Sequence, residues 1–223
     1  MIRAILFMFA SLALAGCSPV SGADFAYPVA TGPAALSGVT VLIYGDSLTQ
    51  QTRDDTSAVL TDAGASVSIY EPNGGDSSDA LENLPQILGG IDILVINTGL
   101  HDMTTLVQNE QFVPDVNRVE PNDFIANLRS IADLCEANGT LLVWRELYAT
   151  QAGAPEYRND DSVRQYRALA HIALDGRAYF VDAYEYTKRH PEFYNPDGVH
   201  MEEPGRSMVG QVVGGAIIGL GIG

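Results

Sequence analysis

The stretch VTVLIYGDSLTQQ, residues 39–51, joins an apolar run to a polar turn and then to the start of a helical pattern. Val39 to Tyr44 is apolar and partly β-branched, as expected of a buried strand. Gly, Asp and Ser are the residues that strand-to-helix turns prefer, for backbone and capping reasons. In an open α/β sheet, the same position between a strand and a helix is where ligands bind. Ser47 is therefore either a turn residue or a nucleophile, whereas Asp46 is expected to cap the turn.

Strand and helix patterns alternate along the rest of the chain. Asn138-Gly139 and Asp175-Gly176 provide stops at the ends of two of the helical patterns. Five short strands that alternate with helices predict an α/β fold, a flavodoxin-like three-layer α/β/α sandwich with a five-stranded parallel sheet. After the first strand, apolar strand patterns recur at 66–70, 91–97, 140–145 and 178–182, and helical patterns occur at 48–63, within 76–88, at 122–138, at 162–174 and after Pro204.

Two segments fall outside this alternation. Residues 103–120 have no clear period and follow a strand end, so they form either a flap over a site or an irregular connection. Residues 208–223 are rich in Gly, carry no charge and are shorter than the roughly 20 residues that a membrane span needs. They predict a helix packed on the sheet with a frayed end, in which Gly210 and Gly214 allow close packing and do not form a membrane dimer motif.

The first 16 residues have the pattern of an export signal. Arg3 precedes the apolar run AILFMFASLALA, and LAGC (residues 14–17) closes it. LAGC resembles the bacterial lipoprotein box, which implies cleavage before Cys17 and acylation of that cysteine; an ordinary signal peptide with a chance cysteine is the alternative. Ser18 resembles the residue that sorts lipoproteins to the outer membrane. We expect a signal peptide at 1–16, a tether at 17–37, a single domain at 38–223, and attachment through Cys17 to the outer membrane, facing the periplasm.

Charge and composition exclude several classes of function. The net charge is −16, and removal of Arg3 with the leader makes it 11 − 28 = −17, so nucleic acid is not an expected partner. Cys135 has no second cysteine in the domain, and it lies on the apolar face of a helical pattern, which predicts a core residue. His171 and His190 lack metal-ligand spacing, so we expect neither a metal nor a cofactor.

Polar, glycine-containing segments follow the first three strands. They are GDSLTQQ, EPNGGDSS (residues 71–78) and NTGLHD (residues 97–102), and NPDGVH (residues 195–200) follows the last strand. Since parallel strands end at one edge of a sheet, these segments converge. Asp197 and His200 are three residues apart, which lets a carboxylate fix an imidazole tautomer and leaves the other ring nitrogen free as a base.

These four segments, in this order, resemble the motif blocks of the SGNH, or GDSL, hydrolase family over nearly all of the domain. The resemblance implies Ser47 as nucleophile, His200 as general base and Asp197 as its orienting acid. It also implies an oxyanion hole formed by the amides of Ser47 and Gly75, with Gly74 as the neighbouring alternative. The implied activity is that of a serine ester hydrolase that acts through an acyl-Ser47 intermediate.

The third block departs from the family, because His101 stands where the family has Asn. A neutral imidazole with the right tautomer can donate to an oxyanion, so His101 is expected either as a third donor or in a structural hydrogen bond. Asp102 is expected to brace the loop. The GLHD sequence resembles the PC-esterase branch of the superfamily, which includes the trichome-birefringence-like proteins.

Three further segments agree with that branch: GDSLTQQ, DGVHMEEPG (residues 197–205) and VWRE (residues 143–146). However, LYATQ follows VWRE, where the branch commonly has a Pro-x-His. Arg145 is a candidate substrate-binding residue for an acyl or sugar carboxylate group; the alternative is an ion pair with Glu146 or Asp182.

The resemblance implies small acyl esters, O-acetyl groups on carbohydrate in particular, as substrates. The same acyl-enzyme would serve an O-acetyltransferase that acts on glycans outside the cytoplasm, so that alternative remains. A non-catalytic glycan-binding lipoprotein is a third possibility, against which the presence of Ser47, Asp197 and His200 argues. The sequence does not indicate the oligomeric state.

Overall fold

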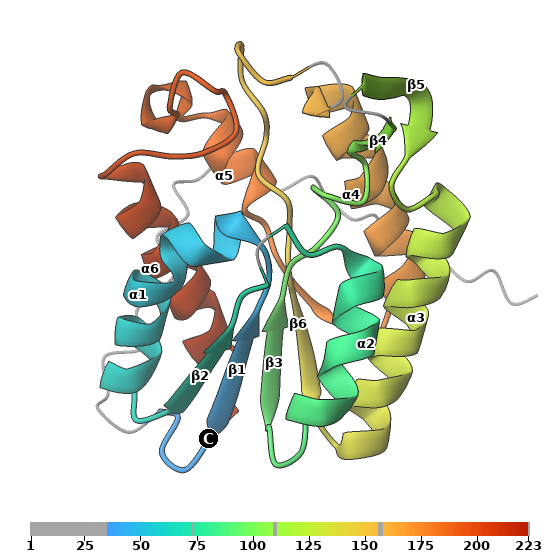
Figure 1. Cartoon of the computed structure of the whole chain (residues 1–223). Coiled ribbons are helices and arrows are strands. Elements are labelled where there is room, and N and C mark those ends of the chain that lie inside the picture. The colour runs from blue at the N-terminus through green and yellow to red at the C-terminus, as the bar shows by residue number, and fades with distance from the viewer. Residues whose placement is uncertain (1–34, 73, 109–110, 156–157, 223) are drawn as a thin grey trace, which may run out of the picture.

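A central parallel sheet organises the protein (Figure 1), for which a computed structural model describes residues 35–222 except 73, 109, 110, 156 and 157. The expected signal peptide, Cys17 and most of the tether lie outside the described residues. The strand order is β2-β1-β3-β6-β7, with every neighbouring pair parallel. This order confirms the predicted flavodoxin-like sheet. The strands are β1 (Thr40–Tyr44), β2 (Ser66–Tyr70), β3 (Ile93–Ile96), β6 (Leu141–Arg145) and β7 (Tyr179–Val181).

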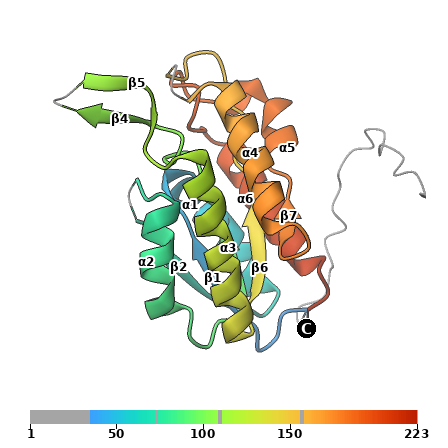
Figure 2. The same ribbon diagram turned by 90° about the vertical axis from the view of Figure 1, so that its right-hand side faces the viewer.

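Helices cover both faces of the sheet, as the two perpendicular views show (Figures 1 and 2). One face carries α1 (Ser47–Asp62) and α6 (Gly205–Ile218), which pack on each other. The other carries α2 (Ser77–Ile87), α3 (Pro121–Asn138) and α4 (Asp160–Leu174), packed in that order. The three-layer architecture predicted from the alternating pattern is therefore confirmed.

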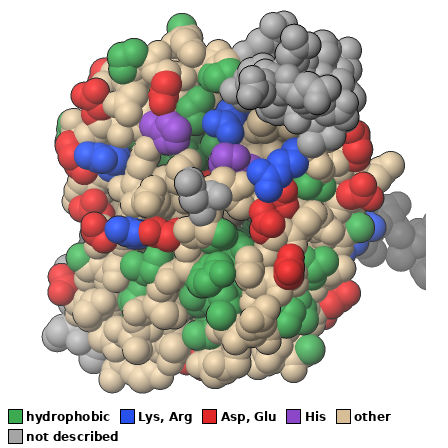
Figure 3. All heavy atoms as spheres, viewed as in Figure 1, with side chains coloured by type: hydrophobic (Ala, Val, Ile, Leu, Met, Phe, Trp, Pro, Cys, Tyr) green, Lys and Arg blue, Asp and Glu red, His purple; other side chains and the backbone are tan. Residues whose placement is uncertain are grey.

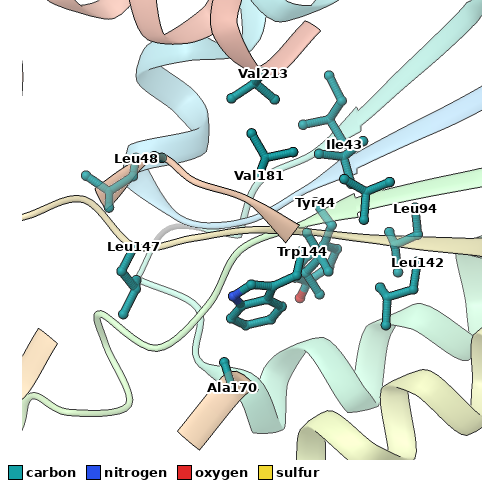
Figure 4. Close-up of a cluster of buried hydrophobic side chains, with 14 of the residues drawn as sticks. Ile43, Tyr44, Leu48, Leu94, Leu142, Trp144, Leu147, Ala170, Val181 and Val213 are labelled. Carbon is teal, nitrogen blue, oxygen red and sulfur yellow. The ribbon is translucent and has the colours of Figure 1, made fainter. Parts of the chain in front are cut away.

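The core lies between the sheet and these two helical layers. Every residue of β3 is buried, as expected of a central strand covered on both faces. Figure 4 shows Tyr44 and Trp144 among aliphatic side chains from the neighbouring strands, with Val213 of α6 approaching from one layer and Ala170 of α4 from the other.

Glycines on α6 let it approach α1 closely. A Cβ atom on Gly210 would lie 2.5 Å from Cβ of Asp55, and one on Gly214 would lie 2.6 Å from Cγ1 of Val59. The predicted role of this glycine pair in close packing is confirmed, although its immediate neighbour is α1. Within the described residues, no helix combines the length and the apolar character that crossing a membrane requires.

The segment 103–120 contains an antiparallel hairpin of β4 (Thr105–Gln108) and β5 (Gln111–Asn117). Figure 2 shows it projecting from the body of the domain. The sequence does not indicate these strands, because the second contains a proline and the turn between them lacks glycine. The sequence also does not indicate the short helix α5 (Tyr184–Lys188) or the 3-10 helix η2 (Pro191–Phe193).

Candidate active site

Ser47 is the first residue of α1, directly after the Asp46 cap. The Asp46 carboxylate accepts hydrogen bonds from the Leu48 N–H at 3.0 Å and from the Asn97 amide at 3.1 Å. The end of β1 is therefore tied to the end of β3 through a buried side chain. The turn residues have both of the properties considered from sequence, since Asp46 caps the helix and Ser47 is presented at its amino end.

Gly45 has no room for a side chain. A Cβ atom there would lie 2.1 Å from Oδ1 of Asn97 and 2.2 Å from Oγ1 of Thr49. The Thr49 hydroxyl donates to that same Asn97 oxygen. This packing explains why the strand-to-helix turn needs glycine immediately before Asp46.

The loop between η2 and α6 places His200 against Ser47. Nε2 of His200 lies 3.1 Å from Oγ of Ser47, and Nδ1 lies 2.7 Å from Oδ2 of Asp197. A carboxylate can only accept, so the proton on the His200 ring belongs on Nδ1, and Nε2 presents a lone pair to the serine hydroxyl. The arrangement is that of a nucleophile, a base and an orienting acid.

Asp197 is held as a carboxylate by its own turn. Burial alone would raise the pKa of Asp197, but the backbone N–H groups of His200 and Val199, which donate to Oδ1 at 2.9 Å each, and the His200 ring lower it overall. The acid therefore stays charged at neutral pH. The His200 side chain is 28% exposed, so solvent and small molecules can reach the pair.

Gln51 supports the His200 loop from α1. Its Oε1 atom accepts the backbone N–H of Met201, the residue after His200, at 3.0 Å. The loop is also held by the Gln151 N–H, which donates to the Gly198 carbonyl at 2.8 Å. Gln51 is the last residue of the GDSLTQQ motif, so its contact with Met201 had a signal in the sequence. The contact between Gln151 and Gly198 had none.

The glycine loop differs from the expectation at Gly75. The Gly75 N–H donates to the Pro72 carbonyl at 3.2 Å, so the amide is used within its own turn and is not available as the expected oxyanion donor. Gly74, with φ of +68°, lies against His101: a Cβ atom there would be 3.6 Å from Cε1 of the ring. Of the two glycines, Gly74 is therefore the one that lies beside His101.

Arg118, at the base of the hairpin, holds the same loop. Its guanidinium donates to the Gly74 carbonyl at 3.0 Å and lies 2.6 Å from Oδ2 of Asp76, the cap of α2. The glycine loop is thus fixed from both sides, by the hairpin base and by the start of a helix.

His101 is a half-buried ring between this loop and Arg158. Nδ1 lies 3.3 Å from Nη2 of Arg158, while Nε2 is buried and has no hydrogen-bond partner among the described residues. Burial lowers the pKa of His101; the charge of Asp46 opposes this and that of Arg158 adds to it, so that the net direction is downward. His101 is therefore neutral at pH 7.

Asp102 braces the third block against the second, as predicted. Its fully buried carboxylate accepts the Ser77 N–H at 3.0 Å, the Thr98 hydroxyl at 2.7 Å and the Gly99 N–H at 2.8 Å. Burial raises the pKa of Asp102 overall, although the hydrogen bonds with Ser77 and Thr98 oppose the rise. Asp197, not Asp102, is the carboxylate hydrogen-bonded to His200.

The expected role of Arg145 in substrate binding is wrong. The side chain is 3% exposed and lies beneath α1, where it donates to the Leu48 carbonyl at 3.2 Å and to Oγ1 of Thr49 at 3.1 Å. It also donates to the Tyr148 hydroxyl. Arg145 is therefore a buried support of the nucleophile helix.

The alternative expectation, an ion pair of Arg145 with Glu146 or Asp182, is also wrong. Glu146 points to the other layer and binds Arg167 at 2.8 Å and His171 at 2.5 Å, both from α4. Within the described part of the chain, no group of three or more His, Cys, Asp or Glu side chains could hold a metal ion.

The face of the molecule in Figure 3 shows two histidine side chains a short way apart, with Lys or Arg side chains next to them. Basic groups thus gather locally on a chain whose net charge is −16.

No family model and no curated protein matches the chain. Several solved structures match the chain in fold. A lipase/acylhydrolase from Enterococcus faecalis superposes with a TM-score of 0.64 at 18% identity, covering 82% of this chain and 96% of its own. An acetyl-xylooligosaccharide esterase from Geobacillus gives 0.65 at 17% identity, covering 84% and 96%. A GDSL-like lipase from Bacteroides thetaiotaomicron gives 0.59 at 17% identity, covering 80% and 87%. The chain has the α/β fold of these lipases and acetyl esterases.

Proposed function

We propose that this protein is a serine ester hydrolase. The observation that carries the proposal is the continuous chain from Oγ of Ser47 through the His200 ring to Asp197, with contacts of 3.1 and 2.7 Å. Ser47 lies 153 positions before His200 in the sequence, and the three side chains meet at the amino end of α1. The positive end of the helix dipole favours negative charge there.

The proposed reaction passes through an acyl-enzyme. As Oγ of Ser47 attacks the ester carbonyl carbon, its proton moves to Nε2 of His200. The resulting oxyanion accepts hydrogen bonds from the Ser47 N–H and from His101. Collapse of this intermediate expels the alcohol, which takes the proton from His200. Water then attacks the acyl group, gives its proton to His200, and acid is released as Ser47 recovers its proton.

We propose that the acyl group is small and that O-acetyl esters of carbohydrates are substrates. Support comes from two sources: the resemblance of GDSLTQQ, NTGLHD and DGVHMEEPG to the PC-esterase branch, and the esterase described as acting on acetyl-xylooligosaccharides, whose fold this chain shares. The half-exposed Asp197 and accessible His200 are consistent with a substrate that extends away from the protein surface.

The test measures acetate release from p-nitrophenyl acetate and from O-acetylated polysaccharides by the wild type and by Ser47→Ala. We expect the substitution to abolish release above the spontaneous rate, because no other described hydroxyl contacts His200 Nε2. Arg53→Ala, at a partly exposed ion pair on the same helix, serves as a matched control that keeps activity. Equal rates for the wild type and Ser47→Ala would overturn the mechanism.

The same assay separates hydrolysis from acyl transfer. Adding an unacetylated glycan acceptor leaves the product of an esterase as free acetate, whereas a transferase moves the acetyl group onto the acceptor. Acetate release without acceptor supports the proposed hydrolase. Acetylation of the acceptor, with little acetate released in its absence, would replace the hydrolase by an O-acetyltransferase with the same Ser47 chemistry.

A further inference from the structure

The two ring nitrogens of His101 have opposite surroundings. Nδ1 lies 3.3 Å from Nη2 of Arg158, and an arginine side chain carries only donors at any pH that the protein meets. Nδ1 must therefore act as the acceptor in this contact. A proton on Nδ1 would place two N–H groups against each other.

A neutral imidazole has one N–H group, so an accepting Nδ1 places the proton on Nε2. Nε2 is buried, and none of the described residues accepts a hydrogen bond from it. A buried donor without a partner is costly in a folded protein and calls for an explanation. A donor held ready for an atom of the substrate is such an explanation. The ring lies against Gly74 and close enough to Asp46, the residue before Ser47, for the charge of Asp46 to act on the pKa of His101.

Arg158 is itself anchored to the loop that carries His101. Its Nε atom donates to the Thr104 hydroxyl at 3.2 Å, and that hydroxyl donates to the Leu100 carbonyl at 3.0 Å. Nε of the guanidinium thus binds the loop, while Nη2 contacts the His101 ring. The contact with Nδ1 fixes both the proton position and the tilt of the imidazole.

Burial and the two neighbouring arginines favour the neutral form of the His101 ring. Burial, the largest influence, lowers the pKa of His101, and the positive charges of Arg158 and Arg118 lower it further, whereas the carboxylates of Asp46 and Asp76 raise it. The pKa of His101 is lowered overall, so at neutral pH the ring is neutral and carries a proton on only one of its two nitrogens.

We propose that Arg158 is a positioning residue, which holds His101 in the Nε2–H tautomer and thereby makes the ring a donor to the oxyanion. The proposal rests on the serine hydrolase function proposed above. In the opposite tautomer, Nε2 would direct a lone pair at the developing negative charge, so Arg158 decides whether His101 stabilises or repels it. With Arg158 in place, the His101 ring presents an N–H group, as the side-chain amide of an asparagine does.

A double-mutant cycle tests the proposal through kcat for p-nitrophenyl acetate. Arg158→Met removes the donors but keeps an apolar stem, and it is made in the wild type and in His101→Asn, where the amide always retains N–H donors. We expect kcat to fall roughly 10-fold in the wild type, less than the ~100-fold or more for loss of an oxyanion donor, because some Nε2–H tautomer persists. In His101→Asn we expect Arg158→Met to change kcat less than twofold.

Two further variants separate positioning from support of the loop. Arg158→Lys keeps a group that only donates and should recover most of the rate. Thr104→Val removes the hydroxyl that accepts from Nε of Arg158 and should lower kcat less than Arg158→Met does. An equal loss from Arg158→Met in both His101 backgrounds, or a loss from Thr104→Val as large as that from Arg158→Met, would overturn the proposal in favour of a structural role.

A spectroscopic measurement tests the tautomer without any activity. In protein labelled with ¹⁵N-histidine, the His101 resonances are those lost in His101→Asn. At pH 7 we expect a neutral ring with the proton on Nε2 in the wild type, and a tautomer mixture in Arg158→Met. A proton on Nδ1, or an imidazolium, in the wild type would refute the inference. If Ser47→Ala showed no loss of rate, the hydrolase proposal would fail while this result still stood.

Discussion

Cys135 is a thiol that packs as a core side chain. It is 1% exposed, on the inner face of α3, and burial raises its pKa to about 12, with the charge of Glu136 adding to the rise and that of Arg177 opposing it. At pH 8 only about one molecule in ten thousand would carry the reactive thiolate. A chain that starts at residue 18 has Cys135 as its single cysteine.

We therefore expect folded protein of that length to resist iodoacetamide at pH 8, and to be alkylated fully in guanidinium chloride, where the thiol has its ordinary pKa. Intact-mass measurement over time follows the addition of one carbamidomethyl group. Labelling of the folded protein as fast as that of the denatured protein would show that Cys135 is accessible, contrary to its placement in the core.

At the scale of single residues, the contact between Ser47 and His200 could be predicted from the sequence, whereas the contacts of Arg145 and His101 could not. Ser47 and His200 meet because the sheet topology determines where α1 begins and where the loop before α6 lies. Arg145 was misread because adjacent residues at a strand end point to opposite faces: Arg145 turns toward α1 and Glu146 toward α4. Nothing in the sequence connects His101 with Arg158, which is 57 positions away.

Among the contacts between elements, the one between α1 and the His200 loop bears most directly on the site. The Gln51 side chain on α1 accepts the N–H of Met201, next to His200, at 3.0 Å. Gln51→Ala removes the acceptor and frees the loop that carries the base. A displacement of about 1 Å can cost roughly 100-fold in rate, so we expect a loss of between about 3- and 100-fold in kcat.

Gln50 provides the matched control for this prediction. It is exposed on the same helix, one position before Gln51, so Gln50→Ala should leave kcat unchanged. Gln51→Glu keeps an oxygen acceptor and should retain more activity than Gln51→Ala. Steady-state kinetics with p-nitrophenyl acetate measure all three variants, and an equal effect of the substitutions at 50 and 51 would contradict the role of the contact.

The elements themselves were predicted where the apolar period was strong. The buried strands read as continuous apolar runs, as strands covered on both faces do, and the five long helices have the period of about 3.6 residues that packing against a sheet imposes. The hairpin at 105–117 was missed because its second strand contains a proline, and α5 was missed because five residues are too few to show a helical period. Short elements at the sheet edge follow local turn geometry, which one sequence specifies weakly.

For the whole molecule, the net charge and the expected anchor act in opposite directions at a membrane surface. A mature charge of −17 disfavours close approach to anionic surfaces, yet the LAGC sequence predicts that Cys17 is acylated and holds the protein at the outer membrane. Residues 18–34 separate that cysteine from the first described residue. Fully extended, a segment of this length reaches about 60 Å, enough to keep an acidic domain away from lipid head groups.

The prediction for the anchor uses the full chain produced in a bacterial host. We expect the wild type to partition into the detergent phase of Triton X-114 and to incorporate labelled fatty acid, because two or more acyl chains give stable membrane attachment. Cys17→Ala removes the acylated atom and should move the protein to the aqueous phase without label, while Cys135→Ala should behave as the wild type. Since residues 35–222 hold the proposed catalytic groups, released Cys17→Ala protein that keeps its folded domain should retain esterase activity in solution. An unlabelled, aqueous wild type would show that the leader is an ordinary signal peptide and that Cys17 has no anchoring role.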